Sequence, residues 1–187
     1  MTNSIVTGAA GFIGSHLVEE LLKIGHTVTA VDNEYADNDK FHWNDKAYNV
    51  KADITDYKSM KGAFANGQDY VFHCAAESRI GPAIENPVNA IDINVKGTCT
   101  VLQCAREAGA KKVMYSSTSS GYGMNPSPNV ETQPDDCLNP YSVSKIAGEK
   151  LCKMYTDLFD LPTVVFRYFN VYGERAPRKG QYAPVIG

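Results

Sequence analysis

Hydrophobic residues along the chain fall into short runs that alternate with stretches of helical period. The apolar runs predict strands at positions 4–7, 26–31, 48–52, 69–73, 112–115 and 163–167. Apolar residues three or four positions apart predict helices that begin near Phe12, cover 55–65 and 87–108, and begin again at Pro140. Polar stretches without a clear period predict loops at 33–47, 77–82 and 124–139.

The first apolar run passes directly into a glycine turn and then into a helix. Glycines stand at positions 8, 11 and 14. Gly8 lets the chain turn sharply because it has no Cβ. Gly11 would let a pyrophosphate approach the backbone, and Gly14 would let the helix lie close to the sheet. Glycines alone are ordinary turn residues, but between a strand and a helix they predict a dinucleotide site at the helix N-terminus.

The second predicted strand ends at Asp32, about 20 positions past the glycines. A carboxylate at this place accepts hydrogen bonds from both ribose hydroxyls and repels a 2′-phosphate, which favours NAD over NADP. The alternative is that Asp32 caps a turn. The loop 33–47 carries the only tryptophan, Trp43. We expect this loop to lie near the adenosine half of the cofactor.

Small and polar side chains follow the next strands. Cys74, Ala75 and Ala76 come after the fourth strand, where small residues let a cofactor pass over the backbone. We expect a substrate at the loop 77–82, and we expect His73 to be a packed structural residue. A run of hydroxyl side chains, 116–120, follows the fifth strand and would point into the ligand crevice.

The segment that begins at Pro140 places Tyr141 and Lys145 one helical turn apart. A free tyrosine has a pKa near 10 and is a poor base at neutral pH. A neighbouring ammonium and a cationic nicotinamide would favour the phenolate, which could then accept a proton from a sugar hydroxyl. Thr118 could hold the same hydroxyl. By itself this spacing is common, and the alternative is a pair of surface side chains.

Composition limits the remaining choices. The 187 residues are enough for one domain, with 43% hydrophobic and 21% charged residues. A net charge of −3 gives no sign of a nucleic-acid surface. Five scattered cysteines indicate reduced thiols in a cytoplasmic protein, and neither they nor the four histidines show metal-ligand spacing. We find no signal peptide and no segment that would span a membrane.

Together these motifs resemble the extended short-chain dehydrogenase/reductase family, in its nucleotide-sugar epimerase/dehydratase group. The resemblance covers essentially the whole chain. The glycine spacing, Gly-x-x-Gly-x-x-Gly, also resembles that of this family. The resemblance implies an α/β fold with a doubly wound parallel sheet, NAD as cofactor and a UDP-sugar as substrate. It also implies a homodimer formed through the helix 87–108 and the helix of Tyr141, with Val95, Leu102, Leu151 and Met154 among the apolar residues.

The resemblance carries roles over to particular positions. The implied catalytic residues are Thr118, Tyr141 and Lys145. The implied cofactor residues are Gly8, Gly11, Phe12, Ile13, Gly14, Asp32, Asn33, Asp53, Ile54, Cys74, Ala75, Ala76, Asn94, Ser116, Tyr141, Lys145 and Tyr168. The implied substrate residues are Ser78, Thr118, Ser119 and Asn170. Two of the cofactor residues also have local interpretations: Asp53 could cap the helix 55–65, and Asn94 could be solvated instead of facing the site.

The residues after Thr118 bear on the reaction. Dehydratases and decarboxylases of the family usually carry an acidic residue there, whereas Ser119, Ser120 and Gly121 follow here. We therefore favour a 4-epimerase of the UDP-glucose/UDP-galactose type, acting through a 4-keto sugar, with N-acetylated sugars left open. The alternatives are a nucleotide-sugar 4,6-dehydratase or a reductase.

The length of the chain raises one more alternative. Family members are longer, and most of their sugar-nucleotide domain follows the motif at Asn170. We expect residues 1–187 to form the NAD-binding domain, with the substrate domain missing or truncated after about 170. A protein of this kind could be an NAD-binding module without turnover.

Overall fold

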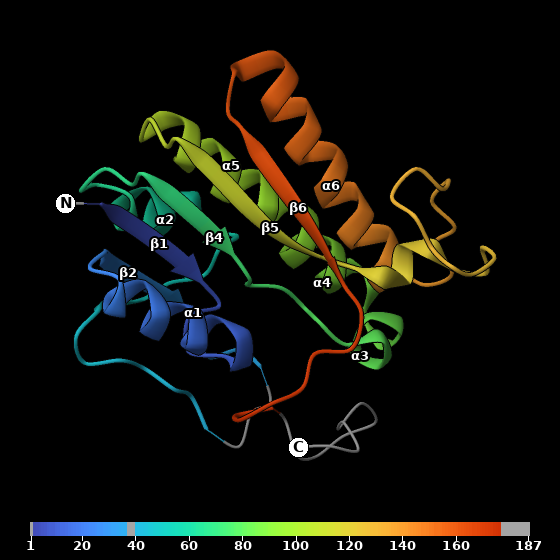
Figure 1. Ribbon diagram of the computed structural model, residues 1–187, viewed down its shortest axis with the longest axis horizontal. Helices are drawn as coiled ribbons and strands as arrows, with labels where there is room; N and C mark the ends of the chain where they lie inside the picture. Colours follow the sequence, from blue (N-terminus) through green and yellow to red (C-terminus); the bar gives the residue numbers. More distant parts are fainter. Residues whose placement is uncertain (1, 37–39, 177–187) are drawn as a thin grey trace.

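The computed structural model describes residues 2–36 and 40–176 (Figure 1). Six strands form one sheet in the order β3-β2-β1-β4-β5-β6, and all neighbouring strands are parallel. The strands are β1 Asn3–Thr7, β2 Thr27–Asp32, β3 Tyr48–Lys51, β4 Tyr70–His73, β5 Lys112–Thr118 and β6 Thr163–Tyr168. This order is that of doubly wound dinucleotide-binding sheets, so the expected fold class is confirmed.

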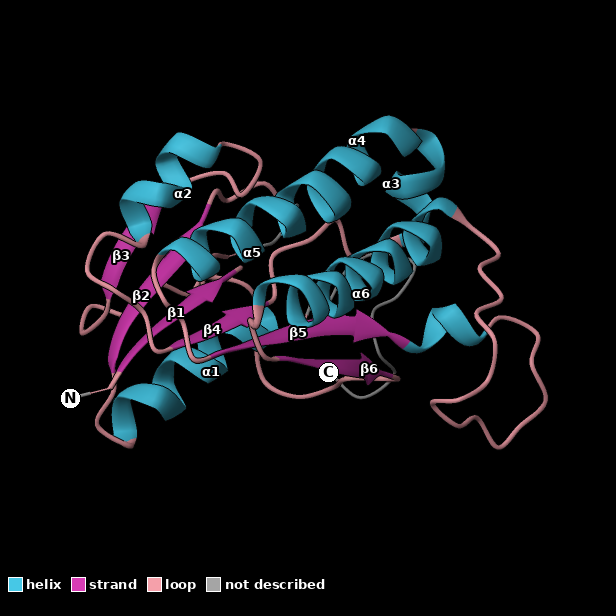
Figure 2. Cartoon of the chain, turned by 90° about the horizontal axis from the view of Figure 1, so that it is seen from above, coloured by secondary structure: helices cyan, strands magenta, loops and turns pink. Residues whose placement is uncertain are grey.

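The helices are divided unequally between the two faces of the sheet (Figure 2). Helix α1, Phe12–Lys23, packs on β1 and β2 from one side. The other helices lie on the opposite side: α2 Tyr57–Ala63, α3 Ile80–Glu85, α4 Pro87–Ile91, α5 Gly97–Glu107 and α6 Pro140–Phe159. A π-helical turn, Asp92–Lys96, joins α4 to α5, and a 3-10 turn, Ser119–Tyr122, follows β5.

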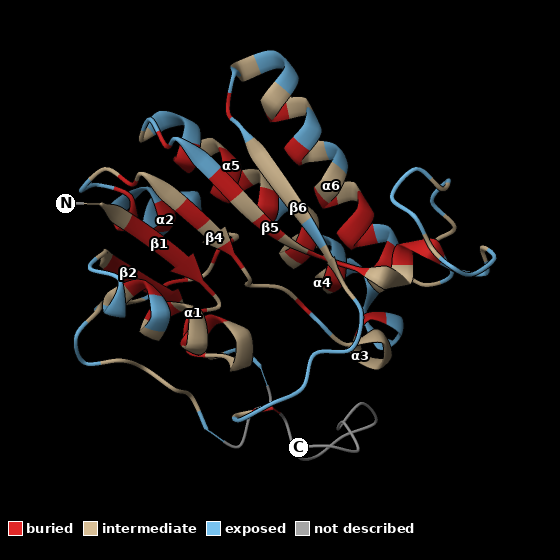
Figure 3. Cartoon of the chain, in the orientation of Figure 1, coloured by how far each residue is buried: buried red, intermediate tan, exposed pale blue. Residues whose placement is uncertain are grey.

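Two apolar cores hold the helices to the sheet, and the buried residues concentrate in its central strands (Figure 3). Ile5 and Val6 follow one another in β1 and enter different cores, because successive side chains of a strand point to opposite faces. The larger core lies beneath α2, α5 and α6 and contains Leu102 and Tyr115. The smaller core lies beneath α1 and contains Val18. The cores therefore hold the carboxyl ends of the strands at one common edge.

Several expected boundaries need correction. Strand β5 continues to Thr118, three residues past its predicted end, because it pairs with β6 as far as Tyr168. The predicted loop 77–82 contains the start of α3 at Ile80. The expected single helix 87–108 is interrupted by the π-helical turn. Gly97 follows this turn, and a Cβ on it would lie 2.6 Å from the side chain of Ile54, so its small size serves packing against that residue.

Candidate active site

The glycine turn forms a cradle in front of helix α1. Gly8 has a φ of 69°, and a Cβ on it would lie 2.8 Å from the Ala75 nitrogen. A Cβ on Gly14 would lie 2.0 Å from the Gly8 carbonyl oxygen, so both positions exclude side chains for steric reasons. A Cβ on Gly11 would approach only the Gly8 oxygen, at 3.3 Å, and would otherwise enter the open cradle. Among the described residues, no side chain caps the first turn of α1, so its N–H groups and the open side of Gly11 fit a pyrophosphate.

Asp32 connects the glycine turn with the end of β2. Its Oδ2 accepts from the Ala10 N–H at 3.0 Å, and its Oδ1 accepts from the Glu34 N–H at 2.8 Å. Burial raises the pKa of Asp32, and the backbone N–H donors oppose that effect. An ionised carboxylate has about four acceptor sites, so two remain for ribose hydroxyls. The Asp32 carboxylate therefore caps a turn, which was the alternative to ribose binding. It also has acceptor sites left for the hydroxyls of a ribose.

Three of the expected cofactor residues, Asn33, Asp53 and Ile54, lie in a second small cluster. The Asn33 side chain donates to Asp53 Oδ2 at 2.8 Å. Asp53 Oδ1 accepts from the N–H and hydroxyl of Thr55, at 2.8 and 2.7 Å. Asp53 is not the cap of α2, because the side chain of Asp56 accepts from the first turn of that helix instead. Ile54 is buried in the larger core, which leaves its backbone for any contact with a ligand.

The ends of β4, β5 and β6 meet beside the cradle. The Ser116 hydroxyl donates to Cys74 Sγ at 3.3 Å, which joins β5 to β4. The Ala75 N–H donates to the Thr7 hydroxyl at 3.3 Å, which joins the end of β4 to β1. Tyr168 ends β6, and burial raises its pKa, an effect that the Ser116 hydroxyl opposes. The tertiary structure thus brings together residues that are far apart in the sequence and that we expect to bind the cofactor.

His73 has a structural role, as expected. Its ring is buried, with Nδ1 2.7 Å from the Thr7 hydroxyl and Nε2 3.0 Å from the Thr98 hydroxyl. Thr98 donates to the Asn94 carbonyl at 2.6 Å, so it accepts from Nε2–H of a neutral imidazole. Burial, aided by the charge of Lys145, lowers the pKa of His73 to about 3. The histidine therefore stays neutral and links β1, β4 and α5.

Tyr141 and Lys145 lie on the first two turns of α6. Asn139 caps this helix in a capping box with Ser142, and its Oδ1 accepts from the Ser142 N–H at 2.9 Å. Lys145 is buried, and its ammonium lies 4.4 Å from the centroid of the Tyr115 ring. The helix and the end of β5 place the tyrosine, the lysine and the threonine around one end of the crevice.

Burial acts on the ionisation of both the tyrosine and the lysine. Burial raises the pKa of Tyr141; the Thr118 hydroxyl opposes this effect, and the Glu77 carboxylate adds to it. Burial lowers the pKa of Lys145 to about 8. Desolvation thus disfavours the charged forms of both side chains. The expectation that Lys145 and a cationic nicotinamide together favour the phenolate of Tyr141 stays a prediction.

Asn94 joins two parts of the site from the π-helical turn. It is buried, which excludes the solvated alternative. Its Oδ1 accepts from the Glu77 N–H at 2.8 Å, and its Nδ2 donates to the Glu77 carbonyl at 3.0 Å and to the Ser144 hydroxyl at 2.9 Å. Ser144 in turn donates to the Tyr141 carbonyl at 2.8 Å. Both amide hydrogens of Asn94 are therefore used to set the first turn of α6 against the loop after β4.

Two acidic residues were missed by the sequence analysis, Glu77 near Tyr141 and Glu149 near Lys145. Glu77 is buried, its Oε1 accepts from the Arg79 N–H at 3.0 Å, and its Oε2 has no partner in the described part of the chain. Its position directly after the small residues of the β4 end is a signal that could have found it. Glu149 accepts from the Ser117 hydroxyl. It lies four residues after Lys145, which continues the spacing of four that begins at Tyr141.

The expected substrate residues share one edge of the sheet. Ser78 follows β4, Ser119 follows β5 and Asn170 follows β6. Because these strands are parallel, their carboxyl ends lie together. Ser78 and Asn170 are exposed, and Thr118 is buried, with its hydroxyl accepting from the Ser120 N–H at 3.1 Å. Phe12 and Ile13 line a hollow of about 470 Å³ between α1 and residues 171–174.

No group of three or more His, Cys, Asp or Glu residues within 2–36 and 40–176 could hold a metal ion. Within the same ranges, no helix has both the length and the apolar character needed to cross a membrane.

Comparison with known proteins places this chain in a family. The sequence profile described as NAD dependent epimerase/dehydratase family matches residues 4–186. A UDP-N-acetyl-alpha-D-glucosaminuronate decarboxylase from Bacillus cytotoxicus is 42% identical, over 97% of this chain and 58% of its own length.

Solved structures agree with this placement. The UDP-glucose 4-epimerase from Thermotoga maritima, solved with UDP-glucose, superposes with a TM-score of 0.93 at 33% identity, over 98% of this chain and 60% of its own. The UDP-glucose 4-epimerase from Thermus thermophilus, in complex with NAD, gives 0.89 at 32% identity, over 97% and 60%. The chain thus spans about three fifths of the length of the relatives it matches.

Proposed function

The chain belongs to the NAD dependent epimerase/dehydratase family, and from this premise we propose that the protein interconverts the C4 epimers of a UDP-sugar of the glucose/galactose type. NAD is the cofactor of this family, and the glycine cradle with Asp32 fits it. The observation that carries the proposal is the grouping of Thr118, Tyr141 and Lys145 at the strand edge beside the cradle.

We propose the following roles for these side chains. Tyr141 accepts the proton of the sugar C4 hydroxyl, and Thr118 holds that hydroxyl. NAD, held by the glycine cradle and Asp32, would supply the hydride acceptor and donor for C4, and return of the hydride to the opposite face of the 4-keto sugar would invert C4. The Lys145 ammonium lies one turn from Tyr141 and supports its phenolate when a cationic nicotinamide adds to the positive charge. Asn94 keeps Tyr141 in place through Ser144.

We assign the other expected residues to the ligands on the same grounds. Gly8, Gly11, Phe12, Ile13 and Gly14 bind the pyrophosphate. Asp32, Asn33, Asp53 and Ile54 surround the adenosine, and Cys74, Ala75, Ala76, Ser116 and Tyr168 contact the nicotinamide half. Ser78, Ser119 and Asn170 would contact the sugar nucleotide, and a further domain would complete the crevice around it.

Decarboxylation of a UDP-uronic acid is the second candidate. The 42% identity to the Bacillus cytotoxicus enzyme favours it. Oxidation at C4 would place a ketone β to the C6 carboxylate, from which CO₂ can leave without a further acid in the site. Against it stands the absence of a carboxylate at Ser119 and Ser120, where the dehydratases and decarboxylases of the family usually carry one.

We also propose a homodimer through α4 and α6, which pack against each other. Leu102 is unsuited to this role because it is buried in the core. Ile84, Val88 and Val143 are exposed apolar residues on this side of the molecule, and Val88 is 79% exposed. A second copy would remove them from water.

The test is to incubate the purified protein with NAD and, separately, UDP-galactose, UDP-glucuronic acid and its N-acetylated 2-amino analogue. Products are identified by NMR, with Tyr141→Phe as control. UDP-glucose from the first mixture supports the epimerase, and CO₂ with a UDP-pentose from the others supports the decarboxylase. NAD binding without any product favours the module without turnover and contradicts our proposal for the protein tested.

A further inference from the structure

Glu34 adopts a backbone conformation that non-glycine residues rarely take. Its φ is 57°, in the left-handed region. This conformation directs its N–H back to Asp32 Oδ1, at 2.8 Å. Local strain of this kind persists where the surrounding structure determines it. The backbone at Glu34 is therefore part of the structure that orients the ribose-binding carboxylate.

The side chain of Glu34 is held in an equally defined place. Trp43 Nε1–H donates to Oε1 at 2.9 Å, and Lys51 forms an ion pair with Oε2. Lys51 ends β3 and is the register partner of Asp32 at the end of β2. The Glu34 and Lys51 side chains keep 29% and 66% of their surface exposed, so a ligand at this edge can contact them.

The charges at this edge come from several elements. Asp32 and Glu34 come from the β2 end, Lys51 from β3, and Asp53 from the turn after β3. Against the effect of burial, the charge of Lys96, in the π-helical turn, helps to lower the pKa of Asp53. The negative charge of Glu34 also contributes to the raised pKa of Asp32, which places the two carboxylates within electrostatic reach. Lys51 is the cation on this edge that contacts Glu34, and the ion pair offsets the charge of the lysine.

We propose that Glu34 is a second cofactor-specificity residue, which excludes the 2′-phosphate of NADP by its own charge and by occupying Lys51. Asp32 alone would repel a phosphate at the ribose, but a free Lys51 at the neighbouring strand end could offset that repulsion. With Glu34 bound to it, Lys51 is unavailable to the phosphate. A 2′-phosphate at this edge would then meet the carboxylates of Asp32 and Glu34, with Lys51 already paired.

The experiment measures binding and requires no turnover, so its outcome is independent of the sugar reaction. Dissociation constants for NADH and NADPH are measured by fluorescence for the wild type, Glu34→Gln, Lys51→Met and Glu34→Gln/Lys51→Met. Glu20→Gln is the matched control, because Glu20 is exposed on α1 and also pairs with a lysine, Lys23.

We expect Glu34→Gln to raise the affinity for NADPH relative to NADH about tenfold. High salt should reduce this gain because charges carry it. The double variant should lose most of the gain, Lys51→Met alone should bind NADPH more weakly with NADH unchanged, and Glu20→Gln should not change the ratio. Unchanged NADH binding serves as the measure of an intact cradle.

An unchanged NADPH/NADH ratio in Glu34→Gln would overturn the proposal. If that variant fails to bind either nucleotide, Lys51→Met decides, because its unchanged NADPH affinity would show that the pair does not affect the 2′ position. An equal gain for both cofactors would also contradict the proposal, since it would point to a general effect on the adenosine site.

Discussion

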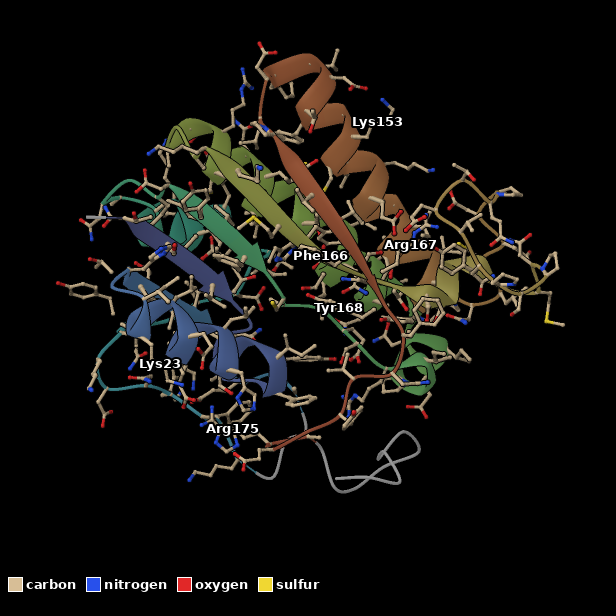
Figure 4. All side chains as sticks on the ribbon, viewed as in Figure 1. Lys23, Lys153, Phe166, Arg167, Tyr168 and Arg175 are labelled. Carbon is tan, nitrogen blue, oxygen red and sulfur yellow. The ribbon has the colours of Figure 1, made fainter. Side chains whose placement is uncertain are left out.

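Glu149 and Arg167 form a two-pronged ion pair between helix α6 and strand β6. Arg167 Nε–H donates to Glu149 Oε1 at 2.9 Å, and its Nη2 donates to Oε2 at 2.7 Å. Both side chains are largely buried, at 14% exposed for the arginine and 11% for the glutamate. Asp135 accepts a further bond from Arg167 at 2.9 Å, and Ser117 donates to Glu149 (Figure 4 labels Arg167 on β6). The pair therefore ties β6, the residue before Thr118 and the helix of Tyr141 into one unit.

We predict that Glu149→Gln destabilises the protein by about 3 kcal/mol, because it leaves a buried guanidinium with one carboxylate fewer. Urea unfolding checks the value. Asp157→Asn is the matched control, since it breaks the exposed Lys153–Asp157 pair on the same helix and should cost no more than about 0.5 kcal/mol. Equal effects of the two substitutions would show that burial does not matter here.

Lys145→Met is predicted to stabilise the protein without ligand at pH 7. Burial lowers the lysine's pKa to about 8, so the unfolded chain binds more protons than the folded one between about pH 8 and 10.5. The cost of the buried ammonium is complete below pH 8 and disappears toward pH 10.5. The substitution should therefore raise the free energy of unfolding by up to about 3 kcal/mol at pH 7. The lost contact with Tyr115 reduces this gain, and the gain should be smaller at pH 10. Urea unfolding at both pH values tests it, and a pH-independent difference would refute the account.

Acid should destabilise the protein through His73. The folded state keeps this imidazole neutral down to about pH 3, whereas the unfolded chain binds its proton below about pH 6.5. Stability from this group is present at pH 7 and is lost as the pH falls, by about 2 kcal/mol at pH 5. The His73→Gln variant should be less stable than the wild type at pH 7, but it should lose less stability than the wild type between pH 7 and pH 5. Parallel losses in both proteins would exclude His73 as the cause.

Tyr141→Phe should reduce turnover by roughly 10²–10⁴-fold in a form of the protein that is active on its sugar substrate. The ring packs equally well, so NAD binding should be unchanged. A Thr118→Val substitution tests the other end of the hydroxyl contact and should lower kcat more than it raises KM. Near-normal activity of Tyr141→Phe would require another base.

Val88→Glu is predicted to convert a dimer into a monomer. A charge at the centre of the proposed α4–α6 surface would have to be buried without a partner. Sedimentation or light scattering at micromolar concentration measures the mass. Ile24→Glu is the control, because Ile24 is equally apolar, 70% exposed and at the end of α1 on the other face. A monomeric wild-type protein would contradict the proposed interface.

Local chemistry allowed much of this protein to be predicted from its sequence alone. Three features could be read from a few neighbouring residues: the glycine turn, Asp32 at a strand end and the spacing of Tyr141 and Lys145. The backbone freedom of glycine and the period of a helix are local properties that do not depend on the rest of the chain. The strand positions followed for the same reason, and the family resemblance supplied the parallel sheet. The π-helical turn was missed because its apolar spacing hardly differs from that of an α-helix.

Only the tertiary structure decided which polar groups are buried and what they meet. Asn94 and Ser144 are 50 residues apart, and Glu149 and Arg167 are 18 apart, so no spacing rule predicts either contact. Burial also opposes ionisation of Tyr141, since the desolvation of a charge depends on everything packed around it. The sequence by itself thus determined the kinds of chemistry and the order of the elements. The packing of the chain determined the ionisation, the partners and the placement of the groups that carry that chemistry.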